Sequence, residues 1–207
     1  PITGLYSRGG KGLSRRMSEQ SIIVSILAAA VTAGTPILYA ALGELLTERA
    51  GILNLGVEGI MLVGAVSGFI ATVASGSCWL GLLAAMLAGG AVAFIHGVLT
   101  ITLRANQTVS GLALTMFGTG LSGYLGKSYI GMPAPQVFKV EPLGPLANIP
   151  FLGPILFQHD VLVYFSYLLV PAMALLIYRT RPGLILRAIG ENPAAADALG
   201  FKVFTLR

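Results

Sequence analysis

Long runs of apolar residues, separated by short polar stretches, follow one another along most of the 207-residue chain. A helix needs about 20 predominantly apolar residues to cross the hydrocarbon core of a bilayer. Five runs are long enough, over residues 20–45, 51–75, 79–103, 107–126 and 161–178. The pattern therefore predicts an all-α fold, a polytopic transmembrane helix bundle with about five membrane crossings.

Composition supports this prediction and argues against several classes of function. Hydrophobic residues make up 55% of the chain and charged residues 10%, whereas a soluble domain carries about 25% charged residues. The net charge of +5 does not indicate nucleic-acid binding, because the Lys and Arg residues are scattered through loops and tails. No catalytic constellation or metal-ligand cluster is visible, and His96 stands alone among apolar residues as a packed or hydrogen-bonded side chain. We expect the lipid bilayer as a partner, and no enzymatic activity, cofactor, metal or nucleic acid.

The chain divides into two parts. Residues 1–16 lack hydrophobic periodicity, so we interpret them as a disordered or non-native leader, with Met17 as the natural start. Residues 17–207 then form one transmembrane domain, in which residues 127–160 make a Pro- and Gly-rich loop that we expect to be ordered by packing rather than by helix.

The basic residues of the short loops predict the orientation in the membrane. If the five crossings alternate, one side holds Arg49, Arg104, Arg179, Arg181, Arg187 and Lys202. That side is expected to be cytoplasmic, which places a loop over residues 179–202 in the cytoplasm and the N-terminus outside. Four basic residues within residues 1–16 oppose this orientation, but the conflict disappears if the protein starts at Met17.

Asn54 and Glu58 are polar residues inside the second apolar run. If the helix is regular they share one face, because they are four residues apart. Burial of a carboxylate at that depth is unfavourable unless it is paired or hydrated. Two interpretations remain open: a structural hydrogen bond or ion pair, with Arg49 or Arg104 as partner, or a polar part of a translocation path or its cytoplasmic gate. Transporters also break helices near binding sites, and three glycines could break this one: Gly51, Gly56 and Gly59.

The stretch GENPAAADALG, residues 190–200, predicts a short, well-ended helix. Asn192 is a favoured N-cap, Pro193 suits the first helical position, and Gly200 can adopt the left-handed conformation that ends a helix. So short a helix is marginal in water by itself, and we expect another protein to dock on it. The docking surface would comprise Ala194, Ala195, Ala198 and Leu199, with Glu191 and Asp197 at its rim. An ordinary interhelical loop with a surface turn is the other interpretation.

Two stretches carry a family resemblance. ERAGILNLGVEGIMLVGA, residues 48–65, and RPGLILRAIGENPAAADALGF, residues 181–201, resemble the permease subunits of ATP-binding-cassette importers in the branched-chain amino acid, ribose and nucleoside group. The first stretch is most similar to the shorter permease of nucleoside-type systems. The resemblance implies that residues 191–200 are the coupling helix that contacts the ATPase, and that the N-terminus is extracytoplasmic. Because family members continue through further membrane helices, we expect this chain to be truncated at its C-terminus.

The resemblance also implies a function. It implies a permease subunit that moves a nucleoside or simple sugar across the bacterial inner membrane by alternating access. Its partners would be a separate ATPase subunit, a second permease subunit and an extracytoplasmic substrate-binding protein. The rival interpretation is a secondary transporter driven by an ion gradient, with Glu58 as the ion-linked carboxylate. A purely structural membrane scaffold is weaker, since it gives no reason for the capped helix.

Overall fold

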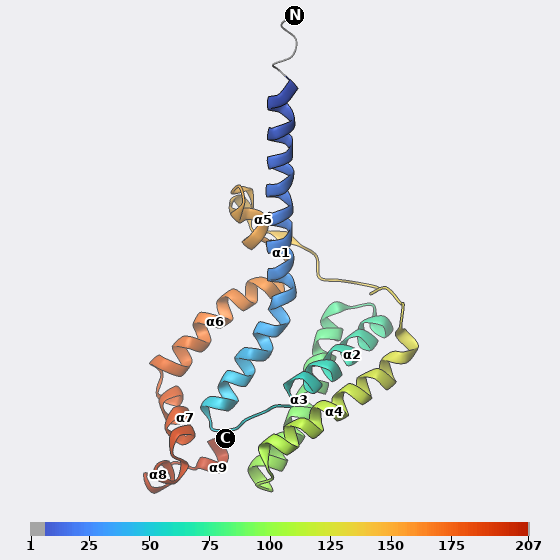
Figure 1. The fold of residues 1–207 in the computed structure, drawn as a ribbon. Coiled ribbons are helices and arrows are strands. Elements are labelled where there is room, and N and C mark those ends of the chain that lie inside the picture. Colours follow the sequence, from blue (N-terminus) through green and yellow to red (C-terminus); the bar gives the residue numbers. More distant parts are fainter. Residues whose placement is uncertain (1–6, 207) are drawn as a thin grey trace, which may run out of the picture. The chain divides into compact units, whose positions relative to one another are not determined.

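The computed structural model describes the backbone of residues 7–206 and the side chains of residues 22–206. Contacts divide the chain into two units, Pro1–Leu38 with Lys139–Leu168, and Tyr39–Phe138 with Leu169–Arg207. The long helices are α1 (Ser7–Arg49), α2 (Val57–Ser75), α3 (Cys78–Gly97), α4 (Gln107–Gly126) and α6 (Val161–Arg179) (Figure 1). The chain then continues through α7 (Arg181–Glu191), α8 (Pro193–Ala198) and α9 (Val203–Leu206). The predicted all-α class is confirmed.

Four helices among the described residues are long and apolar enough to cross a membrane: Ile22–Arg49, Val57–Ser75, Cys78–Thr102 and Val161–Arg179. The third of these includes a short π-helix, η1 (Val98–Thr102), that follows α3. The helix α4 has the bounds that the sequence predicts, but its Gly, Ser and Thr residues make it less apolar than the other four. The number of crossings therefore stays a prediction.

The N-terminal ends of two helices correct the sequence-based prediction. The helix α1 begins at Ser7 rather than at residue 20, within the stretch interpreted as a disordered or non-native leader, while residues 1–6 lie outside the described part of the chain. Once a helix is nucleated, each further residue adds a backbone hydrogen bond, and α1 can extend beyond its apolar part. The helix α2 begins at Val57 rather than at residue 51, because a non-helical segment precedes it.

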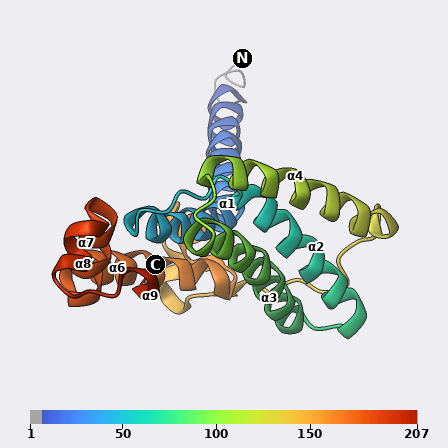
Figure 2. The ribbon, with the colours of Figure 1, turned by 90° about the horizontal axis from the view of Figure 1, so that it is seen from below.

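The unit that contains α2, α3 and α4 is held together by close backbone contacts. The helix α2 packs against both α3 and α4 (Figures 1 and 2). Val63, Val92 and Leu114 form a buried core. A Cβ atom on Gly59 would lie 2.5 Å from the Leu114 carbonyl oxygen, and one on Gly118 would collide with the backbone of Gly59. Such close approach is possible only for glycine. Gly59 and Gly118 thus allow the backbones of α2 and α4 to come into contact where the two helices cross.

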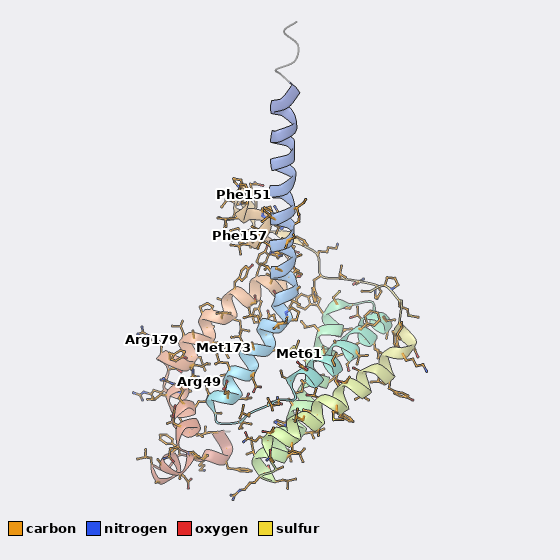
Figure 3. The ribbon with its side chains drawn as sticks, in the orientation of Figure 1. Arg49, Met61, Phe151, Phe157, Met173 and Arg179 are labelled. Atoms are coloured by element: carbon orange, nitrogen blue, oxygen red, sulfur yellow. The ribbon has the colours of Figure 1, made fainter. Side chains whose placement is uncertain are left out.

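The other unit contains the loop that precedes α6, and this loop has more structure than the sequence predicts. It includes η3 (Gly144–Asn148), α5 (Leu152–Leu156) and a two-residue pair of antiparallel strands, β1 (Glu141–Pro142) and β2 (Gln158–His159). A further short helix, η2 (Lys127–Tyr129), belongs to the unit of α4. Figure 3 labels Phe151 and Phe157, which flank α5.

His159 anchors this loop on α1 within the same unit. Its side chain is only 4% exposed. Its Nδ1 lies 3.2 Å from the Thr32 hydroxyl, and its Nε2 lies 2.7 Å from the Ile155 carbonyl oxygen. Because the Ile155 carbonyl can only accept, Nε2 must carry a proton. Asp160, the next residue, accepts hydrogen bonds from the first amides of α6 at 2.9 and 3.1 Å. The loop is thus ordered by packing and by hydrogen bonds together.

Candidate functional site

The helix α8 has the ends that the sequence predicts. Asn192 is extended (φ −149°), ends α7 and starts α8, and its Oδ1 accepts a hydrogen bond of 3.0 Å from the Ala195 amide. Pro193 is the first residue of α8. Gly200 follows with φ +87°, and its amide donates to the Asp197 carbonyl at 2.8 Å. The Asn cap, the proline start and the left-handed glycine are confirmed.

One face of α8 is buried against this chain, and the opposite face is exposed. Ala196 is 3% exposed, and Ile189, on the adjoining α7, is fully buried. The predicted docking surface, Ala194, Ala195, Ala198 and Leu199, is exposed, as are Glu191 and Asp197 at its rim. Leu199 is 78% exposed. Leu199 is the C-cap residue of α8, so this exposed apolar side chain lies at the end of the helix.

A polar cleft lies beside the start of α8, where the ends of α1 and α7 meet. It has a volume of about 380 Å³ and is lined by Glu48, Arg49, Arg187, Gly190 and Glu191. The guanidinium carbons of Arg49 and Arg187 lie 5.9 and 5.3 Å from the centre of the Tyr178 ring, within cation–π range. Arg49 also donates a hydrogen bond of 3.3 Å to the Tyr178 hydroxyl.

Basic residues also lie at the C-terminal ends of two apolar helices, α1 and α6. Figure 3 shows Arg49 at the end of α1 and Arg179 at the end of α6. Cations near a helix C-terminus interact favourably with the helix dipole. The orientation predicted from the sequence would place these two helix ends on the cytoplasmic side.

The segment over residues 50–56 joins α1 to α2 without being helical, and side chains from other helices bind several of its backbone groups. The Leu53 amide donates to Gln107 Oε1 at 2.8 Å, and the Leu53 carbonyl oxygen lies 3.3 Å from His96 Nε2. The Leu55 carbonyl accepts from the Thr115 hydroxyl at 2.9 Å. His96 is 3% exposed and its Nδ1 also lies 3.1 Å from the Ser110 hydroxyl. These bonds fix the segment to α3 and α4.

The same segment is tied to α1 and to itself. The Asn54 amide donates to Glu44 Oε1 at 3.0 Å, and Asn54 Oδ1 accepts from the Gly56 amide at 3.0 Å. Gly51 has a φ of +79°, which lets the chain leave α1 sharply. Side chains of three helices, α1, α3 and α4, thus bind backbone groups of this segment.

The geometry corrects the prediction for Asn54 and Glu58. They do not share the face of a regular helix, because Asn54 lies in the non-helical segment and Glu58 lies in the first turn of α2. The Asn54 amide donates to Glu44 and the Asn54 side chain accepts from the Gly56 amide, so neither of these partners is an arginine. Glu58 is exposed, and among the described residues no ion pair joins it to Arg49 or Arg104.

The prediction that His96 is a packed or hydrogen-bonded side chain is confirmed, but sequence reasoning missed the other residues that hold this segment: Glu44, Gln107 and Thr115. Their signal in the sequence is weak, since each is a single polar residue near a helix end or on a Gly-rich helix. A groove of about 530 Å³ on α3 and α4 is lined mainly by apolar side chains, among them Val92, Ile95 and Phe117. A polar solute would find few partners there.

The apolar helices, the basic helix ends and the non-helical segment define a multi-pass helical membrane protein. The chain belongs to the family described as the branched-chain amino acid transport system permease component, whose family model matches residues 25–207. The family resemblance seen in the sequence is thereby confirmed. The match includes the non-helical segment, α7 and α8.

Individual relatives carry names that refer to sugar or nucleoside transport. A provisionally assigned glucose ABC transporter permease of Haloferax volcanii is 42% identical over 193 residues, covering 90% of this chain and 58% of the relative. A guanosine ABC transporter permease of Bacillus subtilis is 34% identical over 205 residues, covering 92% and 63%. A nucleoside ABC transporter permease of Lactococcus lactis is 34% identical over 203 residues, also covering 92% and 63%. The chain thus spans about three fifths of the length of these relatives. No solved structure matches it significantly.

Proposed function

We propose that the chain is the membrane-spanning permease part of an ATP-driven importer, and that it moves a nucleoside or a simple sugar by alternating access. Membership of a permease family and relatives named for glucose, guanosine and nucleosides support this. The observation that carries the proposal is α8, a capped six-residue helix with an exposed apolar face. The permease itself performs no covalent chemistry, since a separate ATPase subunit supplies the free energy.

The helix α8 is the contact for that ATPase. Its coupling residues are Glu191, Asn192, Pro193, Ala194, Ala195, Asp197, Ala198, Leu199 and Gly200. The exposed alanine face is shallow, so it fits a groove on a partner protein closely, and Leu199 supplies the apolar anchor. In this assignment residues 179–202 form a cytoplasmic coupling loop of a protein in the inner membrane, and the N-terminus is extracytoplasmic.

The assembly needs further partners. A second permease subunit completes the pathway, and an extracytoplasmic binding protein delivers the solute. Asn54 and Glu58 contribute to the path or its cytoplasmic gate, because Asn54 lies in the break before α2 and Glu58 lies in the first turn of α2. Discontinuous helices of this kind line the binding sites of many transporters.

The secondary transporter that uses Glu58 is the competing function. The names of the relatives favour the ATP-driven importer, because they denote ABC transporter permeases. Uptake of radiolabelled guanosine and glucose into vesicles separates the two. The vesicles should carry the permease with its cognate ATPase and binding protein, with and without ATP and a proton ionophore. The importer requires uptake that depends on ATP and survives the ionophore, whereas uptake that ignores ATP and stops with the ionophore would support the secondary transporter.

A further inference from the structure

The end of α7 touches the non-helical segment directly, backbone to backbone. A Cβ atom on Gly190 would collide with the Arg49 carbonyl oxygen and would lie 3.2 Å from the Gly51 amide nitrogen. Gly190 stands two residues before Asn192, the cap of α8. If α8 is displaced, the backbone contact at Gly190 passes the movement on to the start of the non-helical segment. No side chain lies at this contact that could change its conformation and so accommodate the movement.

The other end of the segment meets α4 just as closely. A Cβ atom on Gly111 would lie 2.8 Å from the Leu55 amide nitrogen, and one on Gly56 would lie 2.7 Å from a methyl carbon of Leu114. The hydroxyl of Thr115 binds the Leu55 carbonyl at the same place. The segment is thus in contact with α7 at its start and with α4 at its end.

We propose that the segment over residues 50–56 transmits a displacement of α7 and α8 to α2 and α4. Gly190 and Thr115 are the positioning residues at its two ends. This inference rests on the proposed function. Hinges in proteins are a few loop or helix-end residues that absorb large backbone changes. This segment can act as such a hinge, because it joins α1 to α2 without being helical and is held by side-chain hydrogen bonds that can be exchanged. Coupling between ATPase docking and movement of α2 and α4 is tested by an assay that measures docking and transport separately.

Two pairs of variants provide that assay. Gly190→Ala introduces a methyl group against Arg49, whereas the control Gly90→Ala makes the same change in α3, where no heavy atom lies within 4 Å. Thr115→Val removes the hydroxyl that binds Leu55, whereas the control Thr119→Val removes one that binds only the Thr115 carbonyl of its own helix. Thr115→Ser retains the hydroxyl and should restore function.

The measurement is the amount of radiolabelled guanosine or glucose transported per ATP hydrolysed by the assembled transporter in proteoliposomes, with ATPase binding measured in parallel. Gly190→Ala and Thr115→Val should bind the ATPase as the wild type does but transport roughly fivefold less per ATP, the lower range of allosteric coupling. Both controls and Thr115→Ser should behave as wild type.

A wild-type transport ratio in Gly190→Ala or Thr115→Val would overturn the proposal. If Gly190→Ala does not assemble, the Thr115 variants decide alone, because valine keeps the shape of threonine and α4 stays intact. A wild-type complex without ATP-driven uptake of either solute would instead remove the proposed function, before any variant is compared.

Discussion

Replacing the cap of α8 tests the coupling assignment most economically. Asn192→Ala removes the acceptor for the Ala195 amide, a bond of 3.0 Å. Loss of an Asn cap destabilises a helix by about 1 kcal/mol. Since 1.4 kcal/mol corresponds to a tenfold change in an equilibrium constant, the folded population of α8 falls by up to about fivefold.

The smaller helical population of α8 should appear as a weaker affinity of the permease for the ATPase. If only the helical form of α8 docks, the apparent dissociation constant rises in inverse proportion to the folded fraction. A helix of six residues has little stability of its own, so we expect nearly the full effect, about a three- to fivefold weaker ATPase affinity. Titration of the ATPase subunit onto the permease in nanodiscs measures this constant.

A matched control is present in the same chain. Asn106 caps α4 in the same way, with its Oδ1 accepting from the Val109 amide at 3.2 Å. Asn106→Ala should leave the ATPase affinity unchanged, and Asn192→Ser, which retains a capping oxygen, should restore it. An unchanged affinity in Asn192→Ala, or an equal loss in Asn106→Ala, would refute the reasoning.

Three further predictions concern other parts of the chain. Gly118→Ala would place a methyl group against Gly59, so it should lower the thermal unfolding midpoint by at least about 3 °C; Gly120→Ala, with no heavy atom within 4 Å, should not. His159→Ala removes two contacts of a buried ring, so limited proteolysis in detergent should cut residues 139–160 faster than in the wild type, and an equal rate would contradict its anchoring role. Glu58→Gln should lower the rate of ATP-driven uptake, and uptake by the wild type should resist a proton ionophore; wild-type uptake that is sensitive to the ionophore and becomes resistant in Glu58→Gln would return Glu58 to the role of an ion-linked carboxylate.

How far the sequence predicts the structure depends on how local the determining interactions are. The ends of α8 follow from Asn192, Pro193 and Gly200, whose effects act within a few residues. The apolar runs likewise predict the approximate bounds of α3, α4 and α6. These features need no knowledge of the rest of the fold.

The non-helical segment before α2 is different, because distant residues determine it. Its sequence contains Ile52, Leu53 and Leu55, which continue the apolar run and favour a helical interpretation. The bonds that hold it open come from Gln107, His96 and Thr115, which lie 54, 43 and 60 residues away from their partners. Only the glycines at its ends, Gly51 and Gly56, indicate a break from the sequence.

The role of α8 required a third kind of information. The exposed residues Ala194, Ala195, Ala198 and Leu199 do not by themselves name a partner. The proposed ATPase contact and the two proposed solute classes rest on relatives named as ABC transporter permeases for glucose, guanosine and nucleosides.

Photochemical cross-linking from α8 tests the central claim most directly. With Cys78 replaced by serine, Ala195→Cys carries a thiol-reactive benzophenone on the exposed face of α8, and Ser128→Cys carries it on η2 beyond the far end of α4 as the control. After illumination of the assembled, transport-competent complex, an antibody against the ATPase identifies the adduct. We predict an ATPase adduct from position 195, with a yield that changes when ATP is added, and none from position 128. An active complex that gives no ATPase adduct from position 195 would contradict the assignment of α8 as the coupling helix.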